Sequence, residues 1–189
     1  NLKSVGLQLK CEEKNPLIFV DIARNIMKNN PNIPVKFIMA GDGHLLKPVK
    51  DKIEKEGLTD HIILTGMLTN AQELLADTYL LVVVSNNEGI PLIVMESLAM
   101  NTPVVSTVVG ATEEILKNGI NGYLIPQGQH MSEQFTKKIS HILNDEQLYH
   151  SLASSSNDDY CQMFSQEQMS RQYKSVFEEL LMNGANKNG

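Results

Sequence analysis

The sequence predicts an α/β fold in which one parallel sheet lies between two layers of helices. Short apolar segments of strand type alternate with segments of helical spacing along most of the chain. The run Leu80–Val84 is apolar throughout, which is typical of a parallel strand buried on both faces. With 189 residues, of which 42% are hydrophobic, the chain has enough apolar surface for the core of one domain.

Short segments rich in apolar and β-branched residues predict the strands, and apolar residues that recur every three or four positions predict the helices. The expected strands are Lys3–Leu9, Val35–Ala40, His61–Thr65, Tyr79–Ser85, Pro103–Ser106 and Gly122–Ile125. The helices expected between them are Leu17–Lys28, Leu45–Glu56, Ala71–Ala76, Pro91–Met100 and Thr112–Lys117. Past Gln127 the strands stop, and we expect helices at Met131–Leu143, Glu146–Asn157 and Glu167–Met182.

The domain organisation follows from where this alternation ends. We expect one domain over residues 1–160, a C-terminal helix over 161–183 and a disordered polar tail over 184–189. The chain opens at Asn1 without an initiator Met, and a strand-like segment begins within a few residues, which leaves no room for a signal peptide. We therefore expect a domain cut from a longer protein.

The charge balance and the cysteines exclude several classes of function. Lys and Arg number 16 against 22 Asp and Glu, a net charge of −6, and no basic cluster is present, so we expect no nucleic-acid partner. No apolar run approaches the roughly 20 residues of a membrane span. Two distant cysteines and five histidines without ligand spacing predict no metal site and favour a reducing, cytoplasmic compartment.

Ligands of an open parallel sheet bind at the carboxyl ends of its strands, and the richest loop there is Ser85–Glu96. Pro91 suits the first position of the following helix, which makes Ile90 an N-cap without a side-chain oxygen. The N–H groups of Leu92–Val94 are then free at the positive end of the helix dipole, which predicts a phosphate site. Gly89 leaves the approach to these groups open.

Two carboxylates flank this site in the sequence. The helix is apolar nearly all round and is expected to be buried, so Glu96 in its middle needs hydrogen bonds from protein groups or from ligand hydroxyls. Glu88 lies before the helix, on the other side of the phosphate site. Spacing alone leaves open whether Glu96 only accepts from neighbouring backbone and Glu88 is a solvated loop acid.

These residues carry a family resemblance. The segment Glu88–Glu96, with its continuation to Val105, resembles the E-x7-E segment of the retaining glycosyltransferases of family 4, also called glycosyl transferases group 1, in the GT-B class. Further landmarks of that family follow in the right order between about Val5 and Leu143: Gly41-Asp42-Gly43, Ile63–Gly66, Gly110–Ile115 and Asn118–Leu124.

The resemblance implies a Rossmann-like domain that is the C-terminal, donor-binding half of a two-lobed enzyme, with a nucleotide diphosphate sugar as donor. Glu96 would hold the ribose hydroxyls, and Glu88 would face the donor sugar as the candidate catalytic residue. The backbone of Gly89, Ile90, Pro91 and Leu92 would hold the diphosphate.

The resemblance assigns the remaining site residues as well. Gly66 and Met67 would lie near the nucleobase, and Glu114 matches the acid that follows the Gly-rich turn of the family. Gly41 and Gly43 would shape a turn.

The resemblance also implies the reaction and its partners. Sugar transfer would retain the anomeric configuration, with helix N–H groups and Lys14 in place of a metal, so no cofactor is expected. The acceptor, a glycan or lipid-linked glycan, would bind the missing N-terminal lobe, towards which the final helix would cross. We therefore expect the isolated chain to be inactive in transfer and the whole protein to associate peripherally with the inner face of a membrane.

Two positions depart from the family pattern. Family members carry Gly-Arg after the first strand, whereas this chain has Gly6-Leu7, so a bidentate phosphate ligand is missing. Lys14 fits the family's nearby Lys position, and Lys10 is a neighbouring substitute. Pro91 stands where many relatives have Gly, which removes one N–H donor while favouring the start of the helix.

Other classes of function are alternatives to transfer. A dinucleotide-binding oxidoreductase is disfavoured because Gly41-x-Gly43 lacks its third Gly, with Leu46 in that place, and no P-loop motif occurs. A sugar-nucleotide epimerase of the same architecture would share the fold, but the E-x7-E helix favours transfer. A non-catalytic nucleotide-sugar-binding module is the alternative that the missing Arg keeps open.

Overall fold

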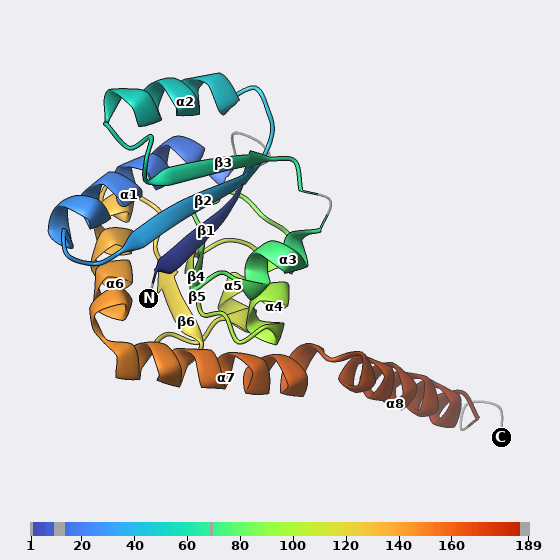
Figure 1. Cartoon of the computed structure of the whole chain (residues 1–189). Coiled ribbons are helices and arrows are strands. Elements are labelled where there is room, and N and C mark those ends of the chain that lie inside the picture. Colours follow the sequence, from blue (N-terminus) through green and yellow to red (C-terminus); the bar gives the residue numbers. More distant parts are fainter. Residues whose placement is uncertain (1, 10–13, 69, 186–189) are drawn as a thin grey trace.

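A computed structural model shows a six-stranded parallel sheet flanked by helices, which confirms the expected fold class (Figure 1). The structure describes residues 2–9, 14–68 and 70–185. Lys10, the neighbouring substitute for Lys14, and Cys11, one of the two cysteines, lie outside these residues. The strand order is β3-β2-β1-β4-β5-β6. The strands are β1 (Lys3–Leu9), β2 (Val35–Gly41), β3 (Ile62–Gly66), β4 (Leu80–Val83), β5 (Val104–Thr107) and β6 (Gly122–Ile125).

The helices cover both faces of the sheet, and the last helix projects away from it (Figure 1). Those between the strands are α1 (Pro16–Asn29), α2 (Leu46–Lys55), α3 (Ala71–Ala76), α4 (Leu92–Ala99) and α5 (Thr112–Ile115). The C-terminal helices are α6 (Met131–Asn144), α7 (Glu146–Phe164) and α8 (Gln166–Ala185).

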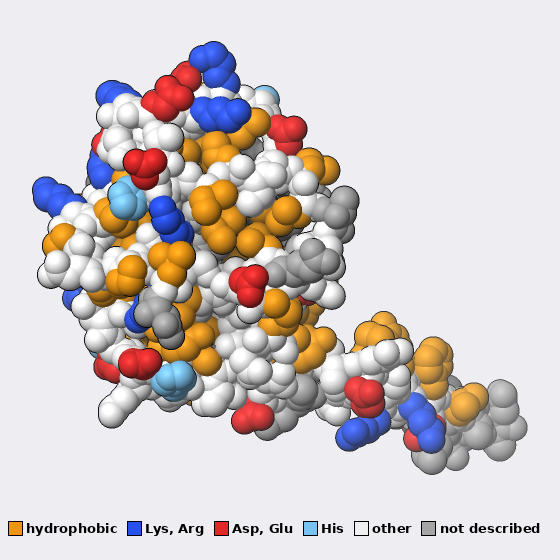
Figure 2. All heavy atoms as spheres, in the orientation of Figure 1, with side chains coloured by type: hydrophobic (Ala, Val, Ile, Leu, Met, Phe, Trp, Pro, Cys, Tyr) orange, Lys and Arg blue, Asp and Glu red, His pale blue; other side chains and the backbone are white. Residues whose placement is uncertain are grey.

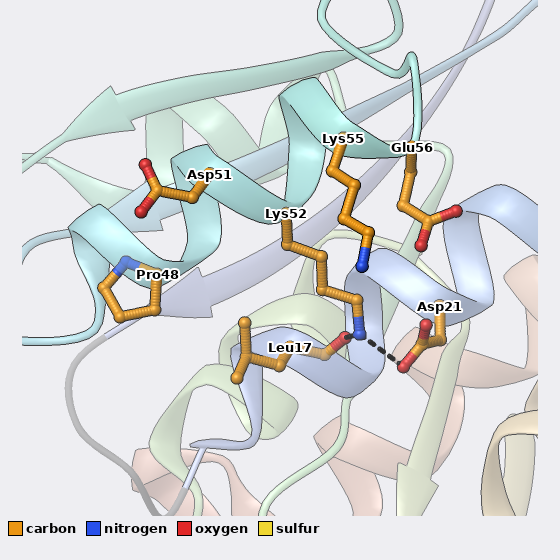
Figure 3. Close-up of a pocket in the computed structure, with 7 residues that line it drawn as sticks. All are labelled: Leu17, Asp21, Pro48, Asp51, Lys52, Lys55 and Glu56. Carbon is orange, nitrogen blue, oxygen red and sulfur yellow. Dashed lines mark hydrogen bonds and ion pairs between the residues drawn. The ribbon is translucent and has the colours of Figure 1, made fainter.

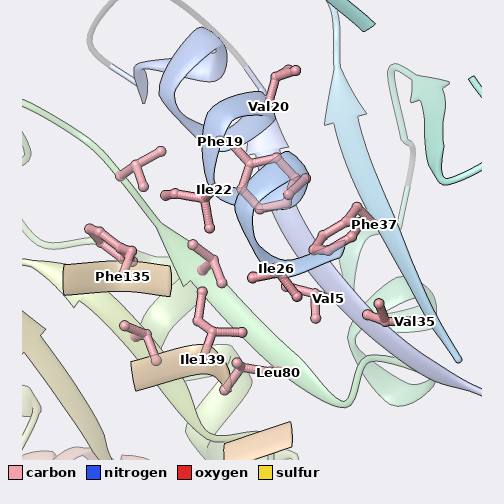
Figure 4. Packing of buried hydrophobic residues seen from close by; sticks show 14 of the residues in the cluster. Val5, Phe19, Val20, Ile22, Ile26, Val35, Phe37, Leu80, Phe135 and Ile139 are labelled. Carbon is pink, nitrogen blue, oxygen red and sulfur yellow. The ribbon is translucent and has the colours of Figure 1, made fainter. Parts of the chain in front are cut away.

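The apolar core consists of two clusters, one on each face of the sheet, because alternate residues of a strand point to opposite faces. Leu80 and Val82 of β4 belong to the larger cluster with α1, α2 and α6, whereas Leu81 and Val83 belong to the smaller one with α3, α4 and α5. The rings of Phe19 and Phe37 meet edge to face in the larger cluster, with centroids 6.0 Å apart (Figure 4).

The strand order creates a topological switch point at the carboxyl edge of the sheet. The chain runs outward from β1 to β2 and β3 and then returns to add β4 on the other side of β1. The loops that leave β1 and β4 therefore diverge to opposite faces, and such a switch point is where open α/β sheets bind ligands. The segment Ser85–Glu96, singled out in the sequence, follows β4 at this point, and its part before α4 is the loop Ser85–Pro91.

Among the boundaries that differ from the sequence predictions, those of α4 and α7 matter for the site and for the domain limit. Helix α4 begins at Leu92, with Pro91 as the N-cap, one residue later than expected. Helix α7 continues to Phe164, so the expected domain limit at residue 160 falls inside a helix. The reason is that Tyr160 and Phe164 pack against the cluster of α3, α4 and α5, which keeps this part of the chain within the domain.

Helix α8 differs from the other helices because one apolar side is exposed along its length. It extends from the body of the domain and reaches Ala185, two residues into the expected disordered tail, whereas residues 186–189 lie outside the described part (Figure 1). Hydrophobic side chains are visible on the projecting helix (Figure 2). The exposed large hydrophobic residues of α8 are Met169, Tyr173, Val176, Phe177, Leu180 and Leu181. Within the described residues, no helix combines the length and apolar character that a membrane crossing requires.

The core assignment predicts unequal effects at two phenylalanines. We expect Phe135→Ala, at a fully buried position of α6, to lower the free energy of unfolding by about 3–5 kcal/mol, because it removes apolar contacts and leaves a cavity. Phe177→Ala on α8, where the ring is 62% exposed, is the control and should change it by less than about 0.5 kcal/mol. Urea unfolding measures both values, and equal losses would contradict the assignment.

Candidate donor site at the carboxyl edge of the sheet

The loop after β4 begins at a buried, hydrogen-bonded serine. Ser85 is fully buried, and its backbone carbonyl accepts a hydrogen bond of 2.6 Å from the Thr107 hydroxyl at the end of β5. The Ser85 hydroxyl in turn donates to the carboxylate of Glu88, at 2.7 Å. The neighbouring strand β5 thus fixes the start of the loop, and the Ser85 hydroxyl within the loop holds the Glu88 carboxylate.

Glu88 forms an ion pair with Lys14, which lies between the end of β1 and the start of α1. The two side chains are only 14% and 15% exposed. A carboxylate at this depth is stabilised by an opposite charge and by hydrogen bonds, and Glu88 has both. The alternative of a solvated loop acid is therefore wrong for Glu88.

The N-terminus of α4 follows the loop and has no side-chain cap. Pro91 is the N-cap in an extended conformation, with φ −75° and ψ 92°, and its carbonyl accepts from the Val94 N–H at 2.9 Å. The expectation of three free N–H groups is thus wrong for Val94, because Pro91 satisfies it. In the described part of the chain, the N–H groups of Leu92 and Ile93 have no acceptor and remain open to an anion.

Helix α4 is buried on one side only, which corrects the expectation of burial all round. Val94, Ser97 and Leu98 form the buried side, whereas Leu92 is 63% exposed. Asn157 of α7 donates to the Ala99 carbonyl at 2.7 Å and so fixes the far end of the helix.

Glu96 lies four residues after Leu92 and so shares its exposed side of the helix. Its side chain is half-buried rather than buried, and within the described ranges no hydrogen bond or ion pair reaches it. Neighbouring backbone therefore does not satisfy this carboxylate. An acceptor of two or more hydrogen bonds is left available beside the helix N-terminus.

The loop after β5 makes close backbone contact with this site. Gly110 adopts φ +48°, and a Cβ at this position would lie 2.1 Å from the Gly89 carbonyl oxygen and 2.3 Å from that of Glu88. The next residue, Ala111, donates its N–H to the same Gly89 oxygen at 3.0 Å. Only glycine permits this approach, so the turn at Gly110 sets the path of the loop that carries Glu88.

The remaining predicted residues lie around this centre or at a distance from it. Gly66 ends β3 with φ +70°, and Met67 beyond it is 69% exposed. Strand β3 stands three places from β4 in the sheet, so these residues lie at the same edge but far along it. Glu114 is exposed on the short helix α5.

A hollow of about 440 Å³ between α1 and α2 lies apart from this site (Figure 3). Lys52 bridges its base by donating to the Asp21 carboxylate at 2.6 Å and to the Leu17 carbonyl at 3.0 Å. Arg24 adds a contact of 3.2 Å to Glu56. These pairs fasten α2 to α1, and none of the sequence-predicted site residues lines the hollow.

Comparison with known proteins confirms the family expected from the motifs. Residues 11–158 match the family described as glycosyl transferases group 1. The N-acetyl-alpha-D-glucosaminyl L-malate synthase of Bacillus anthracis is 24% identical over 166 residues, which are 88% of this chain and 43% of that protein. The chain therefore spans less than half the length of this relative.

Solved structures share the fold. A mutant of TarM from S. aureus, in complex with fondaparinux, alpha-GlcNAc-glycerol and UDP, has a TM-score of 0.82 and 25% identity, and the match covers 93% of this chain and 35% of that one. The C-terminal domain of a glycosyl transferase group 1 family protein (LpcC) from Francisella tularensis has a TM-score of 0.76 and 23% identity over 87% of both chains. The fold is thus the one found in a C-terminal domain of this kind.

The close approach at Gly110 predicts a difference between two glycines of positive φ. Gly119, at φ +76° with nothing within 4 Å of its would-be Cβ, should lose only about 1–2 kcal/mol of stability on Gly119→Ala. Gly110→Ala meets the same backbone penalty and also the Gly89 and Glu88 carbonyls, which should add about 1–3 kcal/mol. Denaturant unfolding of the two variants measures the difference, and equal losses would contradict the contact.

Proposed function

This chain belongs to the glycosyl transferases group 1, and we propose that it is the donor-binding domain of a retaining glycosyltransferase of glycan or polysaccharide biosynthesis. In this proposal the enzyme transfers a sugar from a nucleotide diphosphate sugar to a glycan or lipid-linked glycan. One observation carries it: Glu96, which is half-buried and has no partner among residues 2–9, 14–68 and 70–185, and the ion-paired Glu88 flank an uncapped helix N-terminus.

The donor's diphosphate fits the N-terminus of α4. The N–H groups of Leu92 and Ile93 face outward at the positive end of the helix dipole, with Gly89 and Ile90 leaving the approach open. Lys14 supplies a full positive charge to the same loop. Together these groups hold an anion in a chain whose net charge is −6.

The two carboxylates take the two ends of the donor. Glu96 accepts hydrogen bonds from the ribose hydroxyls, since a half-buried carboxylate with open lone pairs is matched by a pair of neighbouring hydroxyl donors. Glu88 faces the transferred sugar from the other side of the helix N-terminus.

The nucleobase extends along the sheet edge towards Gly66 and Met67. Three strand spacings of about 4.8 Å separate β4 from β3, roughly 14 Å in all, which suits a nucleotide laid along the edge. Glu114 lies on α5, whose preceding turn contacts the acidic loop. We propose that Glu114 lies at the edge of the donor site and takes no part in the chemical step.

The chemistry required of these residues is stabilisation of a leaving group. The acceptor hydroxyl oxygen forms the new bond to the anomeric carbon and loses its proton to the leaving diphosphate. The bond between that carbon and the diphosphate oxygen breaks, and its electron pair leaves with the oxygen as negative charge. Lys14 and the first N–H groups of α4 stabilise this charge, and we propose no metal for the step. Pro91 supplies no N–H of its own, so Lys14 has the larger share. The TarM mutant, which is 25% identical to this chain, has been solved in complex with UDP, a nucleoside diphosphate of the kind that such a step releases.

The second lobe belongs to the same proposal. The acceptor binds a preceding N-terminal lobe, and helix α8 packs its apolar side, which includes Tyr173, Phe177 and Leu181, against that lobe. Those three side chains are 62%, 62% and 74% exposed in this chain. Peripheral contact with the inner face of a membrane would bring a lipid-linked acceptor within reach of the donor site.

Titration calorimetry with UDP, GDP and ADP tests the donor site. We expect saturable binding of one of them and at least a tenfold weaker affinity in Glu96→Ala, because hydrogen bonds to a charged group contribute about 1.5–3 kcal/mol. Glu113→Ala, at an exposed acid of α5, is the matched control for a lost negative charge and should bind as the unsubstituted chain does. Equal affinities of the two variants would overturn the role of Glu96.

A second prediction concerns turnover. The chain alone should release no nucleoside diphosphate from a nucleotide sugar in the presence of any glycan acceptor, because the acceptor groups are supplied by the other lobe. Chromatographic detection of diphosphate release measures this, with a two-lobed relative as the active control. Transfer by the isolated chain would disprove the division of labour between the lobes.

A further inference from the structure

Two asparagines join the segments that carry the site's ion pair. The Asn15 amide nitrogen donates to the Asn86 side-chain oxygen at 2.6 Å, and the Asn86 amide nitrogen donates back to the Asn15 side-chain oxygen at 3.1 Å. Asn15 follows Lys14 directly, and Asn86 stands two residues before Glu88. The reciprocal amide pair therefore runs beside the ion pair, between the same two segments.

The pair is anchored to backbone on both sides. The Asn15 amide nitrogen also donates to the Val84 carbonyl at 2.8 Å, just beyond the end of β4. On the other side, the Gln127 amide donates to the Asn86 carbonyl at 2.9 Å from the loop after β6. Three loops of the carboxyl edge are thus tied together at Asn86.

The backbone of Asn15 is shaped for this contact. Asn15 adopts a left-handed conformation, with φ 45° and ψ 51°, as the N-cap of α1. Its side chain does not cap α1, so it is available for the loop after β4. Asparagine tolerates this conformation better than most residues and also supplies an amide, which glycine could not do.

We propose that Asn86, held by Asn15, is a positioning residue that fixes the Glu88 carboxylate for the donor sugar. This inference rests on the proposed function of the site. Two neutral amides exchange hydrogen bonds without charge, so they hold the loop without competing with the donor diphosphate for Lys14. An aspartate at either position would place a second carboxylate beside Glu88 and draw the ammonium away from it.

The adjacent asparagine offers a matched control. Asn87 is exposed, and in the described part of the chain its side chain makes no hydrogen bond. Asn86→Ala and Asn87→Ala therefore remove the same group from neighbouring positions of one loop. Only the first breaks the amide pair, and thermal unfolding of both checks that the domain stays folded.

The experiment compares bare and sugar-bearing ligands by calorimetry: UDP, GDP and ADP against their glucose, galactose, mannose and N-acetylglucosamine conjugates. The readout is the gain in affinity that the sugar adds. Asn86→Ala should lose about tenfold of this gain while the bare diphosphate binds within about twofold of its original affinity, because a displaced positioning group acts on the sugar alone. Asn87→Ala should behave as the unsubstituted chain.

The double variant separates positioning from general loosening. In a Glu88→Ala background the sugar gain is already lost, so adding Asn86→Ala should change nothing further. A further loss in that background, or equal effects of Asn86→Ala and Asn87→Ala, overturns the inference and leaves the donor site standing. If the unsubstituted chain binds none of the nucleoside diphosphates, both the proposed function and this inference are overturned. If the sugar conjugates bind no tighter than the bare diphosphates, the inference and the role of Glu88 are overturned.

Discussion

The common direction of the six strands is the constraint on which the rest of this structure depends. Because every strand is parallel to its neighbours, all their carboxyl ends meet at one edge, and every return to the opposite edge needs a crossover. Both faces of the sheet are consequently covered by helices, which is why Leu80 to Val83 are buried without alternation. The same constraint gathers Lys14, Glu88 and Gly110, which are distant in sequence, at the single place where the chain reverses its order of strands.

The fold could be predicted from the sequence because hydrophobic burial is a local signal. The run after Tyr79 marks a central strand, and the apolar period of α1 marks its inner side. The helix of Glu96 was predicted one residue too early because the fixed φ of proline suits both an N-cap and a first helical position, and only ψ distinguishes them. Burial of that helix was overestimated, since an apolar composition does not tell how much of a short helix the sheet can cover.

The contacts of the site were beyond sequence reasoning because they are tertiary. Glu88 and Lys14 were each found by motif, yet their pairing depends on β1 and β4 being neighbours, which strand order alone decides. Asn15 and Asn86 carried no motif, and the only local signal was an asparagine directly before a helix that begins with proline. Gly110 was found as a family landmark. The reason why glycine is needed there is the Gly89 carbonyl oxygen, which would lie 2.1 Å from a Cβ at this position and belongs to a different loop.

In the proposed site Lys14 has two electrostatic roles, and its chemistry allows both. An ammonium has three N–H donors, so contact with the Glu88 carboxylate leaves donors for a phosphate oxygen on another side. Without Lys14, the carboxylate of Glu88 and a diphosphate would face each other across a short loop, and their repulsion would act against donor binding. The missing arginine of the family leaves this lysine and the α4 N–H groups as the positive partners of the diphosphate in the proposed site. In the proposed site, the ion pair therefore makes the acidic group assigned to the sugar compatible with an anionic ligand, and the neutral amides beside it keep that balance undisturbed.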